Sequence, residues 1–371
     1  MDKIILTGGS KLSGKIDISG AKNAALPLMA TTLLTNEKMF LENIPRLGDV
    51  GSMRELLEGV GVEIEDSIKN PRCLALKCEK ITNTEAPYDI VRKMRASILV
   101  LGPLIARSGR ASVSLPGGCA IGNRPVDLHL NALTQMGAQI DLSRGYVEAK
   151  VTRGNRLHGS RINFPMVSVG ATENIMLAAS LADGETELSN VAREPEIVNL
   201  AECLIKMGAE IEGHGTDTIR IQGKDSLSGT AHSVIADRIE AGTFMIAAVI
   251  TRGDIEINNI IPDHCKAVIE KLIEAGANIK VSKNSVRVSM KDRPKAVDID
   301  TNAYPYFPTD MQAQMTALNT IALGESTVRE NIFENRFMHV QELIRMGAKI
   351  TVEENKAIIT GSNKLLAAPV M

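Results

Sequence analysis

The sequence of 371 residues predicts an α/β protein that is built from a repeated unit of about 70 residues. Two markers recur at that spacing: a helix that ends at a glycine before a strand, and a second helix that is almost wholly apolar. Strands that alternate with helices are typical of α/β folds. Because units of this size with two helices each are too large for ordinary solenoid repeats, we expect compact domains of several units.

The glycine marker occurs five times, at spacings of 76, 71, 68 and 71 residues. In the third copy, Leu200, Leu204 and Met207 lie at helical spacing before the glycine, and Glu-Ile-Glu alternates like a strand after it. Glycine suits the left-handed residue that follows a helix. The order within a unit is therefore helix, glycine, strand. The five glycines are Gly61, Gly137, Gly208, Gly276 and Gly347.

The apolar helix opens each unit and is expected to be buried on all sides. Turn glycines follow four of these helices at spacings of 75, 69 and 71 residues, so a second marker gives the same period. They are Gly109, Gly184, Gly253 and Gly324. The expected apolar helices are 24–34, 94–106, 171–182, 241–250 and 313–323.

The sequence after Gly347 enters a sixth unit and ends at Met371 before a sixth apolar helix. We therefore expect five units and a fragment of a sixth. Because an incomplete unit leaves apolar faces uncovered, this pattern favours a chain that is cut short. Five units and a fraction as the native design is the alternative.

Composition excludes several classes of partner. The formal net charge is −2 and the aromatic residues are 4 Tyr and 6 Phe, so nucleic acid is not an expected partner. The N-terminus lacks a signal-peptide pattern, and the longest apolar runs, 98–106 and 244–250, are shorter than the ~20 residues of a membrane span. Five cysteines without a CxxC pair fit a reducing compartment. We expect a cytoplasmic protein without a membrane partner.

The strongest chemical candidate is Cys119, which lies in the glycine-rich stretch LPGGCAIGNRPVDLH, residues 115–129. Glycines on both sides favour an exposed thiol, and Arg124 is near enough in sequence to affect its reactivity. A small buried cysteine in a glycine turn is the alternative. Histidines and cysteines show no metal-ligand spacing, so the sequence predicts no metal site and no cofactor.

Three helix starts could bind an anion. Lys22 and Asn23 follow a Ser-Gly turn before the first apolar helix. Arg95 belongs to the basic run VRKMRAS, 91–97, and residues 168–170 open the third apolar helix. The alternatives are a solvated lysine with Asn23 as the helix cap, and a solvated first turn for the basic run.

Carboxylates stand before the last two apolar helices. Asp310 follows Pro308 and Thr309, where it could take a proton from a substrate hydroxyl; a helix cap is the alternative. Asp237 and Glu240 occupy the equivalent place one unit earlier, where a capping or hinge role is equally compatible.

Eight motifs, in order along almost the whole chain, resemble the UDP-N-acetylglucosamine 1-carboxyvinyltransferase family of enolpyruvyl transferases. They are SGAKNAALP, APYDIVRKMRAS, LPGGCAIGNRPVDLH, SVGATEN, AREPEIV, DRIEAGTF, FPTDMQAQ and ENRFMHV. The resemblance implies transfer of the enolpyruvyl group of phosphoenolpyruvate to the 3-hydroxyl of UDP-N-acetylglucosamine, with release of phosphate. This is the first committed step of peptidoglycan synthesis, and it implies roles in cell wall biogenesis, cell shape, cell cycle and cell division.

The resemblance also implies the architecture. The family fold is a two-domain inside-out α/β barrel of βαβαββ units, with the active site between the domains. Residues 22–235 would form the domain that carries the Cys119 loop. Residues 1–21 and 236–371 would form the second domain, incomplete at its C-terminal end.

Roles for single residues follow from the same resemblance. Cys119 would be the general acid and could form a pyruvate adduct, and Asp310 would be the base at the sugar hydroxyl. Lys22 and Arg124 would bind phosphoenolpyruvate. The residues implied to bind UDP-N-acetylglucosamine are Asn23, Arg95, Arg124, Pro125, Val126, Asp127, Leu128, Ser168, Val169, Gly170 and Ile332.

The sequence departs from the family at its end. The family's sixth unit supplies an Asp-Leu-Arg motif and a further arginine for the phosphoenolpyruvate anion, and the sequence stops before both. One lost charged hydrogen bond costs roughly 1.5–3 kcal/mol. A catalytically impaired protein that binds the UDP-sugar is therefore the alternative function, and the sequence leaves the oligomeric state open.

Overall fold

The computed structural model describes residues 3–68, 70–115, 126–152 and 154–371. Within these residues it contains five four-stranded sheets with one common strand order. In each sheet an edge strand pairs in parallel with the second strand, and the remaining two strands join in antiparallel fashion. A buried helix precedes the second strand of each sheet and a further helix follows it. The predicted βαβαββ repeat is confirmed.

The described residues divide into two compact lobes, each with its own apolar core. The first lobe, formed by the described residues between 20 and 235, contains three of the sheets. Their strands, in spatial order, are β13 (Ala231–Ser233), β2 (Lys38–Glu42), β4 (Leu74–Lys77) and β3 (Glu63–Asp66); β5 (Glu85–Ala86), β6 (Arg110–Ser114), β8 (Tyr146–Val151) and β7 (Ala138–Ser143); and β9 (Arg161–Asn163), β10 (Glu185–Ser189), β12 (Thr218–Gln222) and β11 (Glu210–Glu212).

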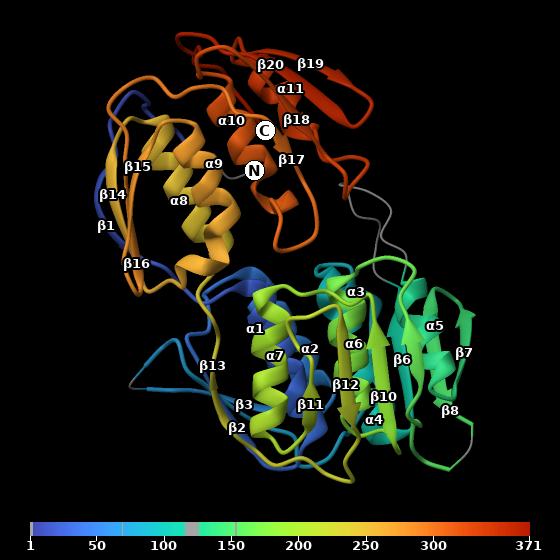
Figure 1. Ribbon diagram of the computed structural model, residues 1–371. Helices are drawn as coiled ribbons and strands as arrows, with labels where there is room; N and C mark the ends of the chain where they lie inside the picture. The colour runs from blue at the N-terminus through green and yellow to red at the C-terminus, as the bar shows by residue number, and fades with distance from the viewer. Residues whose placement is uncertain (1–2, 69, 116–125, 153) are drawn as a thin grey trace. The chain divides into compact units, whose positions relative to one another are not determined.

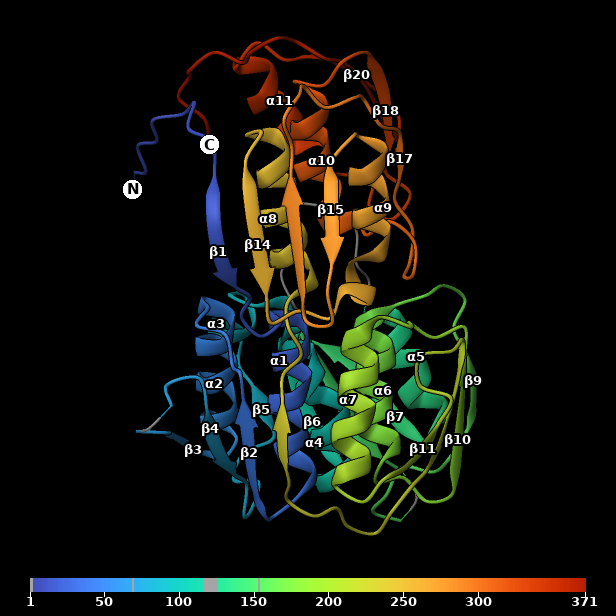
Figure 2. The same ribbon diagram turned by 60° about the vertical axis from the view of Figure 1, so that its left-hand side comes forward.

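The second lobe combines the residues before 20 with those after 235. Figure 2 shows the strands of its first sheet side by side, over helices α8 and α9. The two sheets are β1 (Ser13–Asp17), β14 (Asp254–Asn258), β16 (Ser285–Ser289) and β15 (Asn278–Val281); and β17 (Ile299–Asp300), β18 (Glu325–Arg329), β20 (Lys356–Thr360) and β19 (Lys349–Glu353). Residues 361–371 follow without a helix or strand.

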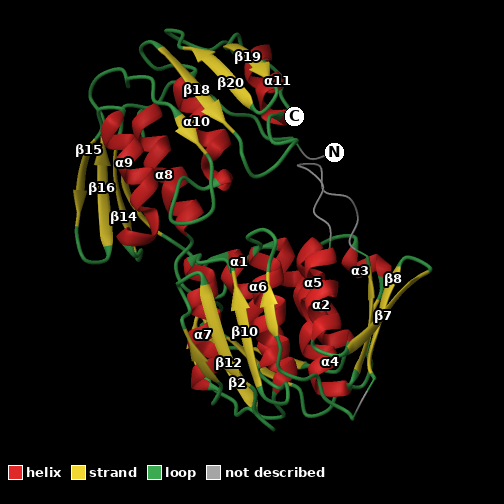
Figure 3. Cartoon of the chain, turned by 45° about the vertical axis from the view of Figure 1, so that its right-hand side comes forward, coloured by secondary structure: helices red, strands yellow, loops and turns green. Residues whose placement is uncertain are grey.

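Helices occupy the interior of the first lobe and strands its periphery (Figure 3). Its buried helices lie side by side because their small and apolar residues allow close contact on every face (Figure 1). They are α1 (Lys22–Ala30) with η1 (Thr31–Leu34), η2 (Arg95–Val100) with α4 (Leu101–Ser108), and α6 (Val169–Ala179). The other helices are α2 (Gly48–Gly59), α3 (Tyr88–Val91), α5 (Asp127–Gln135) and α7 (Pro195–Lys206).

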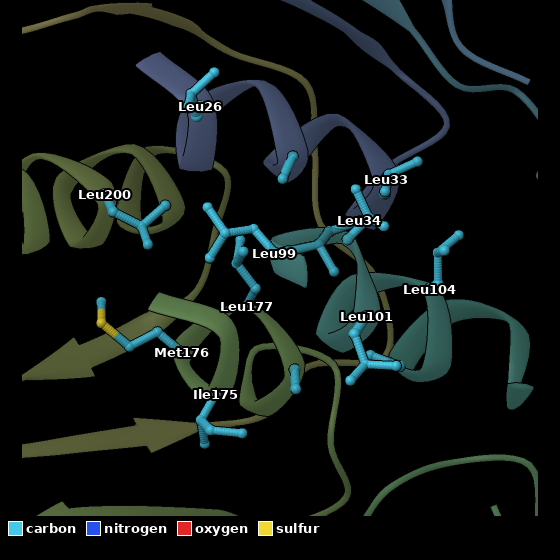
Figure 4. Packing of buried hydrophobic residues seen from close by; sticks show 14 of the residues in the cluster. Leu26, Leu33, Leu34, Leu99, Leu101, Leu104, Ile175, Met176, Leu177 and Leu200 are labelled. Carbon is cyan, nitrogen blue, oxygen red and sulfur yellow. The ribbon is translucent and has the colours of Figure 1, made fainter. Parts of the chain in front are cut away.

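Leucines from several helices meet in this core (Figure 4). Leu33 of η1, Leu101 of α4 and Leu177 of α6 are fully buried. Full burial of one such side chain contributes about 1.5–3 kcal/mol, so the apolar pattern that marks these helices in the sequence also supplies the packing energy.

The second lobe repeats this arrangement with two buried helices, α8 (Arg238–Ile250) and α10 (Gln312–Asn319), the latter after η4 (Thr309–Met311). The sequence predicted an apolar helix over 313–323. In the structure α10 ends at Asn319, four residues earlier, because the chain turns at Thr320 to reach β18. The outer helices are α9 (Lys266–Glu274), after η3 (Pro262–Cys265), and α11 (Met338–Arg345).

The predicted glycine marker is confirmed by backbone conformation, since all five glycines that follow the second helix of a repeat have φ between 88° and 106°. The prediction of a turn glycine at Gly253 needs correction. There the left-handed residue is Arg252, with φ 53°, and a side chain at 253 would lie 2.0 Å from the carbonyl oxygen of Leu12. Glycine is needed at 253 for close approach of β1, not for the turn.

Candidate functional site

Lys22 is the first residue of α1, and the chain reaches it through a tight passage. A side chain at Gly20 would lie 1.8 Å from the carbonyl oxygen of Asn43, so glycine is required there. The cap position is Ala21, which gives no side-chain bond, so the alternative of Asn23 as the helix cap is wrong. Asn23 is exposed instead.

The Lys22 ammonium is held on the surface of the first lobe by one carboxylate. Its Nζ lies 3.0 Å from Asp49 Oδ2, and its side chain is 42% exposed. An ammonium has three donors, so this pair leaves donors available for an anion. No pattern in the sequence indicated Asp49, because the pair joins residues of two different helices, α1 and α2.

The basic run 91–97 separates into two parts. Arg92 pairs with Asp89 at 3.4 Å and Lys93 with Glu55 at 3.3 Å, both on the surface, which agrees with a solvated turn for these two residues. Arg95 is half-buried at the start of η2. It is therefore the member of the run that the fold places toward the neighbouring helices.

Ser168 caps α6, and its Oγ accepts a hydrogen bond from the backbone N–H of Ala171 at 3.3 Å. Val169 and Gly170, in the first turn, are half-buried. A side-chain carbon at Gly170 would lie 3.5 Å from Cε1 of His129, so the start of α6 packs on the His129 ring. The first turn of α6 therefore keeps access to solvent while its position is fixed by α5.

A buried asparagine joins three of the helices. The Asn174 amide donates to the carbonyl oxygen of Ile98 at 2.9 Å, lies 2.9 Å from His129 Nδ1, and accepts from the N–H of Gly102 at 2.7 Å. These bonds link α6 to α5 and to the η2–α4 segment. They bring the starts of η2, α5 and α6 together, and with them the candidates Arg95, Asp127, Leu128 and 168–170.

The His129 ring is neutral at physiological pH. Burial lowers the pKa of His129 to about 4, and the positive charge of Arg95 adds to this effect. A neutral ring can accept the bond from Asn174 at Nδ1, whereas an imidazolium cannot. The position of Asp127, at the exposed first residue of α5, depends on the same buried junction.

Three glutamates lie near the first turns of α6 and α7. Burial raises the pKa of Glu173 well above its usual range, and the charges of Glu196 and Glu194 raise it further. The raised pKa of Glu173 weakens the negative charge at this end of the lobe, which favours an anion there. Glu194 and Glu196 belong to the quoted motif AREPEIV, but the sequence did not indicate their burial.

Three predicted site residues, Cys119, Arg124 and Pro125, lie outside the described residues. Val126 is described; it is buried and occupies the cap position of α5. The remaining candidates of the first lobe fall at helix starts, as the sequence indicated for Lys22, Asn23, Arg95 and residues 168–170.

In the second lobe, Asp310 is held by an arginine. Arg336 Nη2 donates to Asp310 Oδ1 at 2.5 Å, and the Arg336 guanidinium lies over the Phe333 ring at 5.3 Å from its centre. The Asp310 side chain is 37% exposed. Pro308 is the cap residue of η4 and no side chain caps it, so the alternative of Asp310 as a helix cap is wrong. Arg336 belongs to the motif ENRFMHV, but the motif did not indicate that Arg336 pairs with Asp310.

Ile332 lies in the loop after β18 and is 36% exposed. The other carboxylates of this lobe have structural contacts. Asp237 caps α8 and accepts from the N–H groups of Ile239 and Glu240 at 2.8 and 3.0 Å. Glu240 Oε2 accepts from the Oγ of Ser19 at 2.6 Å. The capping role predicted as one reading for Asp237 is confirmed.

The described residues contain no group of three or more His, Cys, Asp or Glu side chains with the geometry of a metal site. None of the helices in the described part of the chain is both long and apolar enough to cross a membrane. The features that remain are two sets of surface-accessible polar groups: helix starts with Lys22, Arg95 and Ser168, and a carboxylate–guanidinium pair at Asp310. Helix starts and cations suit phosphate oxygens, and an exposed carboxylate suits a proton acceptor.

Comparison with solved structures shows the fold. The enolpyruvyl transferase NikO from Streptomyces tendae matches with a TM-score of 0.82 at 21% identity, over 95% of this chain and 83% of that one. EPSP synthase from Acinetobacter baumannii matches with a TM-score of 0.69 at 21% identity, over 97% of this chain and 84% of that one.

Comparison of sequences shows the family. The model of EPSP synthase (3-phosphoshikimate 1-carboxyvinyltransferase) matches residues 6–371. Two relatives named UDP-N-acetylglucosamine 1-carboxyvinyltransferase, from Granulibacter bethesdensis and Geobacter metallireducens, are 56% and 53% identical over 371 residues. Each match covers all of this chain and 88% of the relative. The chain therefore belongs to the EPSP synthase family and, within it, to the UDP-N-acetylglucosamine 1-carboxyvinyltransferases.

Proposed function

We propose that this protein transfers the enolpyruvyl group of phosphoenolpyruvate to the 3-hydroxyl of UDP-N-acetylglucosamine and releases phosphate. The observation that carries this proposal is 56% identity, over all of this chain, to a relative that bears the name of that activity. In this proposal the reaction takes place in the cytoplasm and serves peptidoglycan synthesis, cell wall biogenesis and cell division.

Asp310 acts as the base in this proposal. It takes the proton of the sugar 3-hydroxyl while the hydroxyl oxygen forms a bond to C2 of phosphoenolpyruvate. Its pairing with Arg336 at 2.5 Å holds the carboxylate in one place, and 37% exposure of the side chain leaves it open to a substrate. Cys119 supplies the proton that C3 of phosphoenolpyruvate gains in this addition.

The second half of the reaction reverses the proton transfer. The methyl carbon returns a proton to the thiolate of Cys119, the carbon–carbon double bond re-forms and the phosphate leaves with the electrons of its carbon–oxygen bond. Asp310 gives its proton to the departing phosphate or to solvent. Lys22 and Arg124 bind the phosphate and neutralise charge on it. The Lys22–Asp49 pair supports this role, since it keeps the ammonium at the start of α1 without using all of its donors.

The sugar nucleotide is bound by the helix starts of the first lobe. The backbone N–H groups of residues 168–170 and the guanidinium of Arg95 suit a diphosphate. The buried junction at Asn174 supports this assignment, because it holds η2, α5 and α6 together at the ends that carry the candidates. Asn23, Arg124 to Leu128 and Ile332 complete the proposed contacts.

Phosphate release from phosphoenolpyruvate tests the proposal. The purified chain is assayed with and without UDP-N-acetylglucosamine, and the Cys119→Ser variant serves as the blank. Release that depends on the sugar and exceeds the blank is the expected result. Release without the sugar, or none with it, would contradict the proposal.

A further inference from the structure

Three of the five repeats share a structural feature at the end of the second strand of their sheets, and two repeats, those of β6 and β18, lack it. In three sheets the residue after this strand is a left-handed asparagine: Asn43, Asn190 and Asn259, with φ of 57°, 56° and 57°. The amide of Asn43 donates to the carbonyl oxygen of Val234 at 3.0 Å, and Asn190 does the same to Phe164 at 2.8 Å. The side chain thus fixes the chain that leaves the parallel edge strand.

Strand register places Glu330 at this position in the fifth sheet, since Arg329 of β18 pairs with Asp300 of β17. The backbone of Glu330 does not adopt the left-handed conformation. The next residue, Asn331, supplies the missing bond and donates to the carbonyl oxygen of Thr301 at 3.1 Å. Glu330 therefore does not have the task that Asn43 and Asn190 have at the same position in two of the other sheets.

Glu330 has four hydrogen bonds of its own, although it is only 3% exposed. Its Oε1 accepts from the Thr301 hydroxyl at 3.0 Å and from the N–H groups of Ile332 and Phe333 at 2.9 and 3.2 Å. Its Oε2 accepts from the Thr309 hydroxyl at 2.9 Å. A carboxylate buried to this degree is costly unless its oxygens are satisfied in this way.

These bonds connect two residues of the proposed site. Thr309 directly precedes Asp310, the proposed base, and Ile332 is a proposed contact of the sugar nucleotide. We propose that Glu330 is a positioning residue for the transfer reaction, which sets Asp310 and the Ile332 loop in a fixed mutual geometry. The inference rests on the proposed function. It also explains why this repeat departs from the left-handed asparagine: local rules are broken where a site requires it.

Replacement of the carboxylate is the direct test. Glu330→Ala removes all four bonds and should lower kcat for sugar-dependent phosphate release roughly 10²-fold, the effect typical of a misplacement by about 1 Å. Glu330→Gln keeps one oxygen for Thr301 and the two N–H groups, while its amide can donate to the Thr309 hydroxyl. The Gln variant should therefore recover most of kcat.

Asn319→Ala is the matched control for stability. Asn319 is fully buried at the far end of α10 and bonds the N–H and carbonyl of Val297 at 3.1 and 2.9 Å. Its loss should lower the unfolding midpoint as Glu330→Ala does, while kcat of the folded protein stays within twofold. If Glu330→Ala does not fold, Thr309→Val and Thr309→Ser take its place, because only serine keeps the hydroxyl that donates to Oε2.

The outcomes separate the two claims. The inference is supported if Glu330→Ala or Thr309→Val loses kcat and the matching Glu330→Gln or Thr309→Ser recovers it. The control Asn319→Ala should then show no loss of kcat. An active wild type with a Glu330→Ala or Thr309→Val variant indistinguishable from Asn319→Ala overturns the inference alone. A wild type without sugar-dependent release overturns the proposed function, and the inference falls with it.

Discussion

Lys22 and His129 show how single residues acquire their chemistry from neighbours distant in sequence. Lys22 is an exposed lysine whose position is fixed by Asp49 at 3.0 Å. His129 is a buried ring that stays neutral because burial and Arg95 lower its pKa to about 4. In both cases the residue type was visible in the sequence, whereas the partner was not.

Loss of the Lys22 charge should affect phosphoenolpyruvate more than the sugar. Lys22→Met removes a charged donor worth about 1.5–3 kcal/mol, so kcat/KM for phosphoenolpyruvate should fall roughly 10- to 100-fold. Lys93→Met is the control, since Lys93 also pairs with one surface carboxylate, Glu55 at 3.3 Å. Equal kinetics for the two variants would show that Lys22 is only a surface lysine.

His129 makes stability depend on pH. Between pH 6.5 and about 4 the unfolded chain binds a proton that the folded chain does not, so this contribution is complete above pH 6.5 and is lost as the pH falls toward 4. The loss should reach about 3 kcal/mol for this ring. His232, whose pKa burial also lowers to about 4, titrates in the same range. Urea unfolding of the wild type and of His129→Gln at pH 7 and 5 measures how much of the pH dependence of stability is due to His129. The same pH dependence in both proteins would refute the contribution of His129.

At the scale of helices, α6 holds together the helix starts that are proposed to bind the nucleotide, those of η2, α5 and α6 itself. Asn174, in the second turn of α6, satisfies the N–H of Gly102, the carbonyl of Ile98 and the ring of His129. The sequence predicted α6 from its apolar run and its start from Ser168. It could not predict the junction, because the three partners come from separate segments of the chain.

Replacement of Asn174 should act on stability and on binding together. Asn174→Leu leaves buried polar groups without partners, each at a cost of about 1–3 kcal/mol, and frees the starts of η2 and α5 from α6. The unfolding midpoint should fall and the calorimetric affinity for UDP-N-acetylglucosamine should weaken at least tenfold. Asn319→Leu, in the other lobe, should lose stability without loss of affinity. Unchanged affinity in Asn174→Leu would assign the junction to folding alone.

At the scale of the whole molecule, five repeats were predictable because their markers are local: a glycine stop and an apolar helix in each. The pairing of strands from distant parts of the chain was not predictable. β13 completes the sheet of β2, and β1 completes that of β14, across some 190 and 240 residues of sequence. Parallel pairing of this kind has no signature in spacing. The candidates at helix starts were found because start signals are local, whereas Arg336, Asp49 and Glu330 act through contacts between elements.

The stabilisation of the folded chain by each substrate should depend on the order in which the substrates bind. We expect UDP-N-acetylglucosamine to bind before phosphoenolpyruvate. The sugar nucleotide alone, at 100 times its Kd, should then add about 2.7 kcal/mol to the free energy of unfolding. Phosphoenolpyruvate alone should add little, and more once the sugar is bound. Thermal unfolding with each ligand and with both measures this. A shift with phosphoenolpyruvate alone as large as that with the sugar would contradict the order.

The product itself tests the central claim most directly. Mass spectrometry of a reaction with both substrates should find UDP-N-acetylglucosamine that carries one enolpyruvyl group, formed in a one-to-one ratio with phosphate. Unmodified sugar nucleotide, whether or not phosphate is released, would contradict the assignment of enolpyruvyl transfer to this protein.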